Sequence, residues 1–135
     1  MSTAQDSTLS IKSGRGANVA LWALQVLLAA AFLMAGATKL AGPEMMVKQF
    51  EAIGLGQWFR HLTGALEVVA AVLLLVPRRS GLGALLLIPI MLGAAVAHLV
   101  VFKNSPAVPL VVLALAAVVA WGRLMRDPVA TNTSD

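Results

Sequence analysis

The sequence predicts an all-α integral membrane protein in which four helices cross the bilayer as a bundle. Of its 135 residues, 59% are hydrophobic and only 12% are charged, about half the charged share of a typical soluble domain. The uncharged residues form four long runs, each near the roughly 20 residues that a helix needs to cross the hydrocarbon layer. Helices are expected because a segment in lipid must satisfy its own backbone hydrogen bonds.

The chain begins with a polar segment and continues into the first span. Residues 1–17 are mostly small and polar, and we expect them to form a disordered cytoplasmic tail. The first apolar run covers about 19–40. It is longer than the apolar core of a signal peptide and is not followed by a typical cleavage site, so we expect it to remain in the mature protein.

The connection at 41–58 predicts a short amphipathic helix on the extracytoplasmic membrane surface. Pro43 and Glu44 suit a helix start, and Gly54 suits its end. Apolar side chains recur at i, i+4 and i+7, the spacing of one helical face: Met46, Phe50 and Ile53. An ordered loop without a helix is the alternative.

The other three spans are expected at about 58–76, 82–102 and 107–121. Together with the first they define a four-span membrane domain at 18–122. Residues 123–135 are then a cytoplasmic C-terminal tail.

The distribution of lysine and arginine predicts the orientation in the membrane. Six basic residues lie on the side of the two termini: Lys12, Arg15, Arg78, Arg79, Arg123 and Arg126. Four lie on the other side: Lys39, Lys48, Arg60 and Lys103. Because positive residues accumulate on the cytoplasmic side, both termini are expected there, and the bacterial inner (plasma) membrane is the expected location.

The composition excludes several functional classes. The basic residues form no continuous stripe, so nucleic-acid binding is not expected. The chain has no cysteine, which excludes thiol–disulfide chemistry and thiolate metal sites. The few histidines and acids show no close ligand spacing, so no metal site is predicted.

The main functional clue is Glu67, which lies inside the otherwise apolar second span. A carboxylate near the middle of a span is costly and usually faces protein or water. Thr63, Gly64 and Ala71 share its helical face, and the small neighbours allow another helix to approach closely. We therefore expect Glu67 to point into the bundle.

Two other spans offer polar partners for this carboxylate. Helical spacing places Lys39 at the end of one stripe in the first span, with Gln25, Ala29, Phe32 and Gly36. It places His98 at the end of a second stripe in the third span, with Gly83, Leu87, Met91 and Ala94. We expect Lys39, Glu67 and His98 to lie together in the outer half of the bundle. Lys39 can extend inward to the acid or outward to the headgroups.

The same residues permit a structural and a functional interpretation. A buried ion pair can simply hold two helices in register. Alternatively, Glu67 and His98 transfer protons as catalytic residues, and Lys39, Glu67, His98 and Thr63 form a ligand site.

Three segments resemble the DoxX-like family of small four-span membrane proteins. They are FLMAGATKL (32–40), the second span with Gly64 and Glu67 as a Gly-x-x-Glu element, and MLGAAVAHL (91–99) with its histidine. The resemblance covers about 18–122 and implies a four-helix membrane bundle. It also implies roles ranging from quinone-linked oxidoreductase subunit to maturation partner or chaperone-like protein, without an agreed catalytic role for Lys39, Glu67 or His98.

Three functions follow as hypotheses. The first is a scaffold or accessory subunit for another membrane or periplasmic protein. The second is a quinone-linked redox subunit in which Glu67 transfers protons and a quinone is the cofactor; only in this case would the chain belong to an enzyme. The third is a small proton-coupled transporter. The expected partners are the lipid bilayer and another membrane or periplasmic protein, and a homo-oligomer is the alternative.

Overall fold

The computed structural model describes residues 3–126, with the side chains of residues 14–125. All regular secondary structure in residues 3–126 is helical. The helices are α1 Thr3–Ala41, α2 Glu44–Ile53, α3 Gln57–Leu75, α4 Ser80–Val100 and α5 Ala107–Arg126. This confirms the predicted fold class.

Four segments are long and apolar enough to cross a membrane: Gly14–Ala41, Gln57–Leu75, Ser80–Val100 and Ala107–Met125. The structure describes part of each expected tail, and the rest of the two tails, 1–2 and 127–135, lies outside the described residues. The α1 helix begins at Thr3, inside the expected tail at 1–17, and α5 continues to Arg126, inside the expected tail at 123–135. Extending an existing helix adds one hydrogen bond per residue fixed, whereas starting a new one is unfavourable, so a stable span readily continues into polar sequence.

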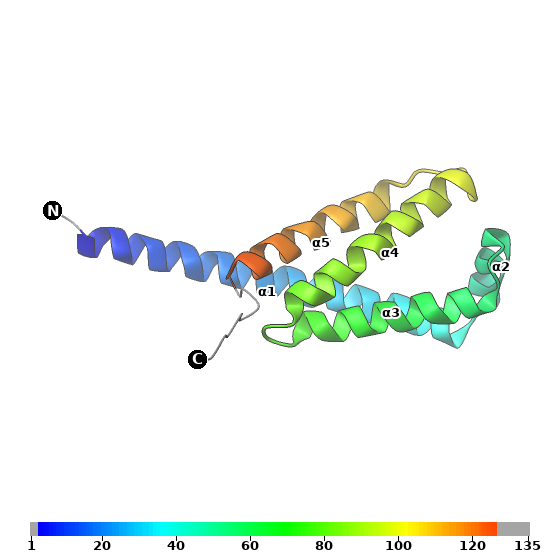
Figure 1. The fold of residues 1–135 in the computed structure, drawn as a ribbon, viewed down its shortest axis with the longest axis horizontal. Coiled ribbons are helices and arrows are strands. Elements are labelled where there is room, and N and C mark those ends of the chain that lie inside the picture. Colours follow the sequence, from blue (N-terminus) through cyan, green and yellow to red (C-terminus); the bar gives the residue numbers. More distant parts are fainter. Residues whose placement is uncertain (1–2, 127–135) are drawn as a thin grey trace, which may run out of the picture.

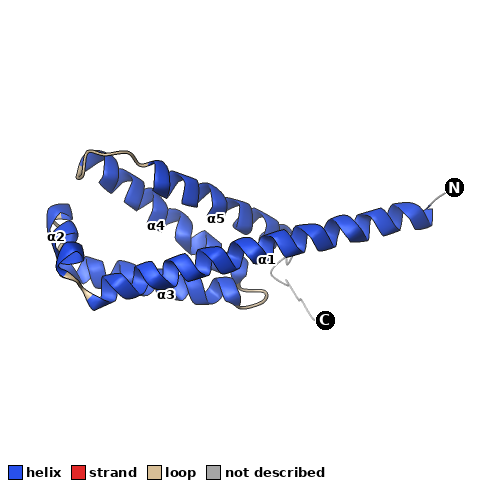
Figure 2. Ribbon diagram, turned by 180° about the vertical axis from the view of Figure 1, so that it is seen from behind, coloured by secondary structure: helices blue, strands red, loops and turns tan. Residues whose placement is uncertain are grey.

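The four spanning helices form two antiparallel hairpins, α1 with α3 and α4 with α5 (Figures 1 and 2). The α3 and α4 helices also pack together, and α1 contacts α5. We call the end with the α3–α4 turn at 76–79 the turn end. The opposite end, with α2 and the α4–α5 connection at 101–106, is the α2 end.

The packed core lies mainly in the half of the bundle near the turn end. Its members are Leu28, Ala29, Phe32, Ala70, Ala71, Leu74, Ala84, Leu87, Met91, Ala116, Val119 and Ala120. On α4 the outermost member is Met91, eleven residues from Ser80, which is about 17 Å from the turn end at 1.5 Å per residue. Beyond this level the two hairpins diverge toward the α2 end (Figures 1 and 2).

Close backbone packing joins the hairpins near the turn end. A Cβ atom at Gly83 of α4 would lie 2.7 Å from the carbonyl oxygen of Ala70 and 2.9 Å from the amide nitrogen of Leu74, both on α3. Only glycine allows this approach. Small residues at such positions are what permits helices to associate in lipid, where no hydrophobic driving force acts between them.

The connection between the first two spans contains the predicted amphipathic helix. It ends at Gly54, whose φ of 84° is left-handed and favours glycine. Phe50 is buried and packs on Phe59 of α3 at 5.9 Å between ring centroids, and Gln57 Nε2 donates to the Val47 carbonyl oxygen at 3.0 Å. The apolar face of α2 therefore packs against the start of α3.

Candidate functional site

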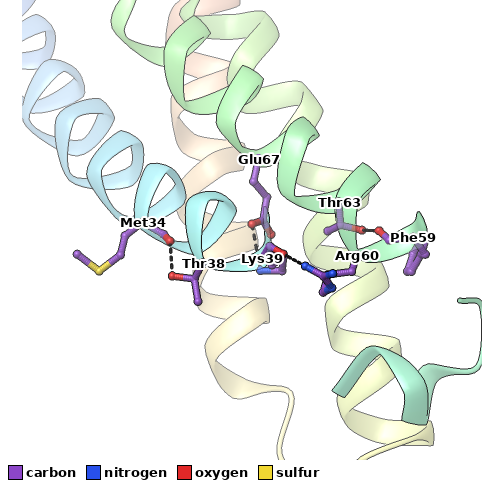
Figure 3. Close-up of polar contacts among 7 residues, drawn as sticks. All are labelled: Met34, Thr38, Lys39, Phe59, Arg60, Thr63 and Glu67. Atoms are coloured by element: carbon purple, nitrogen blue, oxygen red, sulfur yellow. Dashed lines mark hydrogen bonds and ion pairs between the residues drawn. The ribbon is translucent and has the colours of Figure 1, made fainter. Parts of the chain in front are cut away.

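An ion pair between α1 and α3 forms the candidate site (Figure 3). Lys39 Nζ lies 3.0 Å from Glu67 Oε2 and donates a hydrogen bond to it. The Glu67 side chain is 3% exposed, and that of Lys39 is 18% exposed. The expected inward orientation of Glu67 is thus observed, with a cation as its partner.

Glu67 lies near the middle of the bilayer span. It is ten residues after Gln57 and eight before Leu75, which places it about 15 Å and 12 Å from the two ends of α3. Lys39, in contrast, lies two residues from the end of α1. Its side chain therefore extends inward from the α2 end, which answers the question left open by the sequence.

A close crossing of α1 and α3 brings the two charges together. A Cβ atom at Gly36 would lie 2.7 Å from the Gly64 carbonyl oxygen, and one at Gly64 would lie 3.0 Å from the Gly36 carbonyl oxygen. Each glycine precedes its charged residue by three positions, as Gly-x-x-Lys and Gly-x-x-Glu. Positions three apart share a helical face, so the crossing aligns both charges along one seam.

The antiparallel direction explains why the cation is a lysine with a long side chain. From the glycine crossing, Lys39 lies about 4.5 Å toward the α2 end and Glu67 about 4.5 Å toward the turn end. Their backbones are thus about 9 Å apart along the axis. The long aliphatic stem of lysine spans this offset.

Arg60 lies near the start of α3 and binds the C-terminal end of α1. It is buried, and its Nη1 donates to the carbonyl oxygen of Lys39. Its Nε donates to Gln57 Oε1 at 2.7 Å, and its Nη2 lies 3.3 Å from His61 Nε2. A helix ends with unpaired carbonyl groups and a partial negative charge, so a guanidinium there is favourable. From the sequence, Arg60 is expected either to hydrogen-bond between helices or to anchor at the headgroups, and the structure shows the interhelical bond.

His98 does not share the recorded contacts of the ion pair. Its Nδ1 lies 2.6 Å from Asn104 Oδ1, and its ring meets Phe102 edge-on at 5.6 Å. It lies eighteen residues after Ser80, or about 27 Å from the turn end, whereas Glu67 is about 12 Å from the same end. His98 therefore lies about 15 Å further along the bundle axis.

Thr63 is half-buried near the α2 end of α3. Its Oγ1 donates to the carbonyl oxygen of Phe59 at 2.8 Å, within its own helix (Figure 3). Of the four sequence-predicted site residues, the structure joins Lys39 to Glu67 and holds Thr63 and His98 in local hydrogen bonds.

A second polar cluster lies near the turn end, where α1, α3 and α5 meet. Gln25 is fully buried; its Nε2 donates to the Leu74 carbonyl oxygen at 2.8 Å, and its Oε1 accepts from Arg123 Nε at 2.5 Å. Arg123 Nη1 also donates to Asn18 Oδ1 at 2.7 Å, and its guanidinium lies 5.4 Å from the Trp22 ring. In the sequence, Arg123 is a basic residue just past the last apolar run and contributes only to the predicted orientation.

The acidic and histidine side chains of residues 3–126 form no metal-binding cluster. No three histidine, aspartate or glutamate side chains gather there as a metal site would require. The chemistry available at the ion pair is hydrogen bonding to, or protonation of, one buried carboxylate.

Comparison with protein families supports the resemblance seen in the sequence. The family described as the DoxX-like family matches residues 23–120, a region that includes the α1–α3 ion pair and most of all four spans. Comparisons with curated proteins and with solved structures give no significant match. Since the family match covers well over half of the chain, the protein belongs to the DoxX-like family of membrane proteins.

Proposed function

We propose that this protein is a non-enzymatic accessory subunit, a scaffold that holds another membrane or periplasmic protein. The observation that carries the proposal is the divergence of the two hairpins toward the α2 end (Figures 1 and 2). The core that joins them ends near Met91, so the halves near the α2 end keep apolar surface for another chain.

The state of the ion pair supports the same function. Lys39 neutralises Glu67 within the α1–α3 hairpin, and the glycine crossing fixes both residues in place. A buried ion pair of this kind sets the register of two helices. Such a rigid hairpin is suited to presenting a surface to a partner.

A quinone-linked redox role receives less support from the geometry. A relay of protons from Glu67 to His98 would have to cover about 15 Å along the bundle axis. His98 is engaged with Asn104 at the α4–α5 connection. This separation favours the accessory role.

We further propose that the protein lies in a bacterial inner membrane with both termini in the cytoplasm. The six basic residues at the turn end and its flanking termini, against four at the α2 end, support this orientation. The α2 end and any partner domain docked there would then be extracytoplasmic.

Site-specific photo-crosslinking in native membranes tests the accessory role. A photoreactive phenylalanine derivative at Ala94, which packs near the outer limit of the core, should give one discrete adduct. The same residue at Leu85, an exposed position near the turn end, is the control and should give none. An adduct of twice the chain mass would identify a homo-oligomer. If the Ala94 variant remains monomeric after irradiation and in gentle detergent, the accessory role is wrong.

A further inference from the structure

The turn end of the bundle carries exposed cations without acidic partners. Arg78 and Arg79 are adjacent in the α3–α4 turn, at the same end of the bundle as the C-terminal end of α5 (Figure 1). Both side chains are exposed. The two ion pairs recorded among the described side chains lie elsewhere, one between α1 and α3 and one within α2. The two guanidinium groups of the turn are therefore open to an anion from outside the chain.

The charge balance differs between the two ends of the bundle. Among the side chains of residues 14–125, the acids are Glu44, Glu51 and Glu67, and none of them lies at the turn end. Over the whole sequence, the turn end with both termini has six basic and three acidic residues, an excess of three positive charges. The rest of the chain has four basic and three acidic residues, an excess of one. An anion is thus attracted more strongly to the turn end.

Two tryptophans place the turn at the level of the lipid headgroups. Gln25 bonds to the carbonyl oxygen of Leu74 at the end of α3, and Trp22 lies three residues, about 4.5 Å, further toward the turn end. Trp121 is 74% exposed and lies two residues before Arg123, which also bonds to Gln25. Indole rings gather at the membrane–water interface. The two arginines of the turn follow Leu74 by four and five residues, so they lie where lipid phosphates are found.

We propose that the Arg78–Arg79 turn binds the phosphate group of an anionic phospholipid. A guanidinium can pair with two phosphate oxygens through parallel N–H···O bonds, and two adjacent arginines can hold one headgroup. The same oxygens occur in free phosphate, but the interfacial position of the turn favours a lipid, whose acyl chains keep the headgroup at this level. This inference goes beyond the accessory role and does not depend on it.

The backbone of the turn offers a variant that removes one cation without harming the fold. Arg78 has a φ of 71°, in the left-handed region that favours glycine, so Arg78→Gly relieves the backbone while it removes the charge. Lys103 provides a matched control at the α2 end. It is also exposed, and its φ of 51° is left-handed as well. Arg78→Gly and Lys103→Gly therefore remove the same charge from the same backbone conformation at opposite ends.

Native mass spectrometry of the full chain in a non-ionic detergent measures the binding of the first added lipid. Phosphatidylglycerol should bind more tightly than phosphatidylcholine with the same acyl chains. Arg78→Gly should weaken phosphatidylglycerol binding about fivefold, the effect of one basic residue near an anionic lipid surface, and adding Arg79→Gln should weaken it about fivefold again. Lys103→Gly should change it less than twofold. Circular dichroism of each variant confirms that the helices are intact.

Three results would overturn the inference. The first is equal binding of the two lipids by the native protein. The second is an equal loss of phosphatidylglycerol binding in Arg78→Gly and Lys103→Gly, which would mean that the lipid responds only to net charge. The third is displacement of the lipid by millimolar inorganic phosphate, which would assign the turn to a free anion. The crosslink at Ala94 tests the accessory role separately, because that position is not part of the turn.

Discussion

Replacing Lys39 by methionine should strongly destabilise the protein, because it leaves Glu67 buried without its cation. At the observed 3.0 Å separation of Nζ and Oε2, an effective dielectric constant near 20 gives an attraction of about 5 kcal/mol. The partial exposure of Lys39 reduces this value. Since breaking buried pairs typically costs 3–5 kcal/mol, we expect Lys39→Met to lower the free energy of unfolding by about 3–4 kcal/mol.

The same reasoning predicts that removing both charges is far less harmful. Methionine at both positions keeps the volume of the two side chains and removes the cost of desolvating two charges. The free energy of unfolding of Lys39→Met/Glu67→Met should therefore lie within about 1 kcal/mol of the native value. Reversible unfolding of the two single variants and the double variant, measured by circular dichroism in mixed micelles with increasing denaturing detergent, gives the coupling energy. It should be about 3 kcal/mol.

Additivity would contradict this account. If each single variant loses less than about 1 kcal/mol and the double variant loses their sum, the two side chains do not act as a pair. The charges would then face lipid headgroups or water independently, and the close α1–α3 seam would have another cause.

Three further predictions follow from the packing and the polar clusters. Gly36→Ala should cost about 1–3 kcal/mol, because its Cβ would meet the α3 backbone at 2.7 Å, whereas Gly93→Ala, with open space around the new Cβ, should leave the unfolding free energy within about 1 kcal/mol. Gln25→Leu should cost about 2–4 kcal/mol in the same unfolding assay, since it removes the donor to the buried Leu74 carbonyl oxygen and the acceptor of Arg123 Nε; a smaller loss would mean that water fills the place. Because the chain has no cysteine, Gln49→Cys should react with a membrane-impermeant maleimide from outside intact cells and Arg78→Cys only after permeabilisation; the reverse pattern would invert the proposed orientation.

Helical periodicity was sufficient to predict which residues share a buried face. The stripe that ends at Lys39 is buried along Gln25, Ala29, Phe32 and Gly36, and Glu67 turns inward on the face of Gly64 and Ala71. These positions follow from spacing within a single helix, which tertiary structure does not change. The Lys39–Glu67 pair could therefore be predicted as a hypothesis.

The position of a residue along the bundle axis was harder to predict than the helical face on which the residue lies. The sequence predicts His98 beside Glu67 because both residues are expected nearer the outer ends of their spans, but in the structure Glu67 lies slightly nearer the turn end. The α3 and α4 helices leave the same turn, however, and Glu67 is eight residues from the end of α3 at that turn while His98 is eighteen residues from the start of α4. Counting from the shared turn gives the 15 Å offset, but it requires helix boundaries that the sequence alone places only within a few residues.

The cluster around Gln25 shows a different limit of sequence reasoning. Its two members Gln25 and Arg123 are 98 residues apart, and their contact depends on the relative register of α1 and α5. A single arginine just past an apolar run is normally an interfacial charge. No local pattern distinguishes that case from a buried guanidinium held by amide side chains.

The two polar clusters together explain why the hairpins separate at one end only. In lipid the association of helices depends on close packing and interhelical hydrogen bonds. The α1 helix bonds to α3 at both levels, through Lys39 and Gln25, but within the described residues its recorded side-chain hydrogen bonds to α5 are only those near the turn end, made by Asn18 and Gln25 with Arg123. The glycine contact of α4 with α3 also lies near the turn end. Specific attraction between the hairpins is thus concentrated at the turn end, and the α2 end is where the proposed partner would dock.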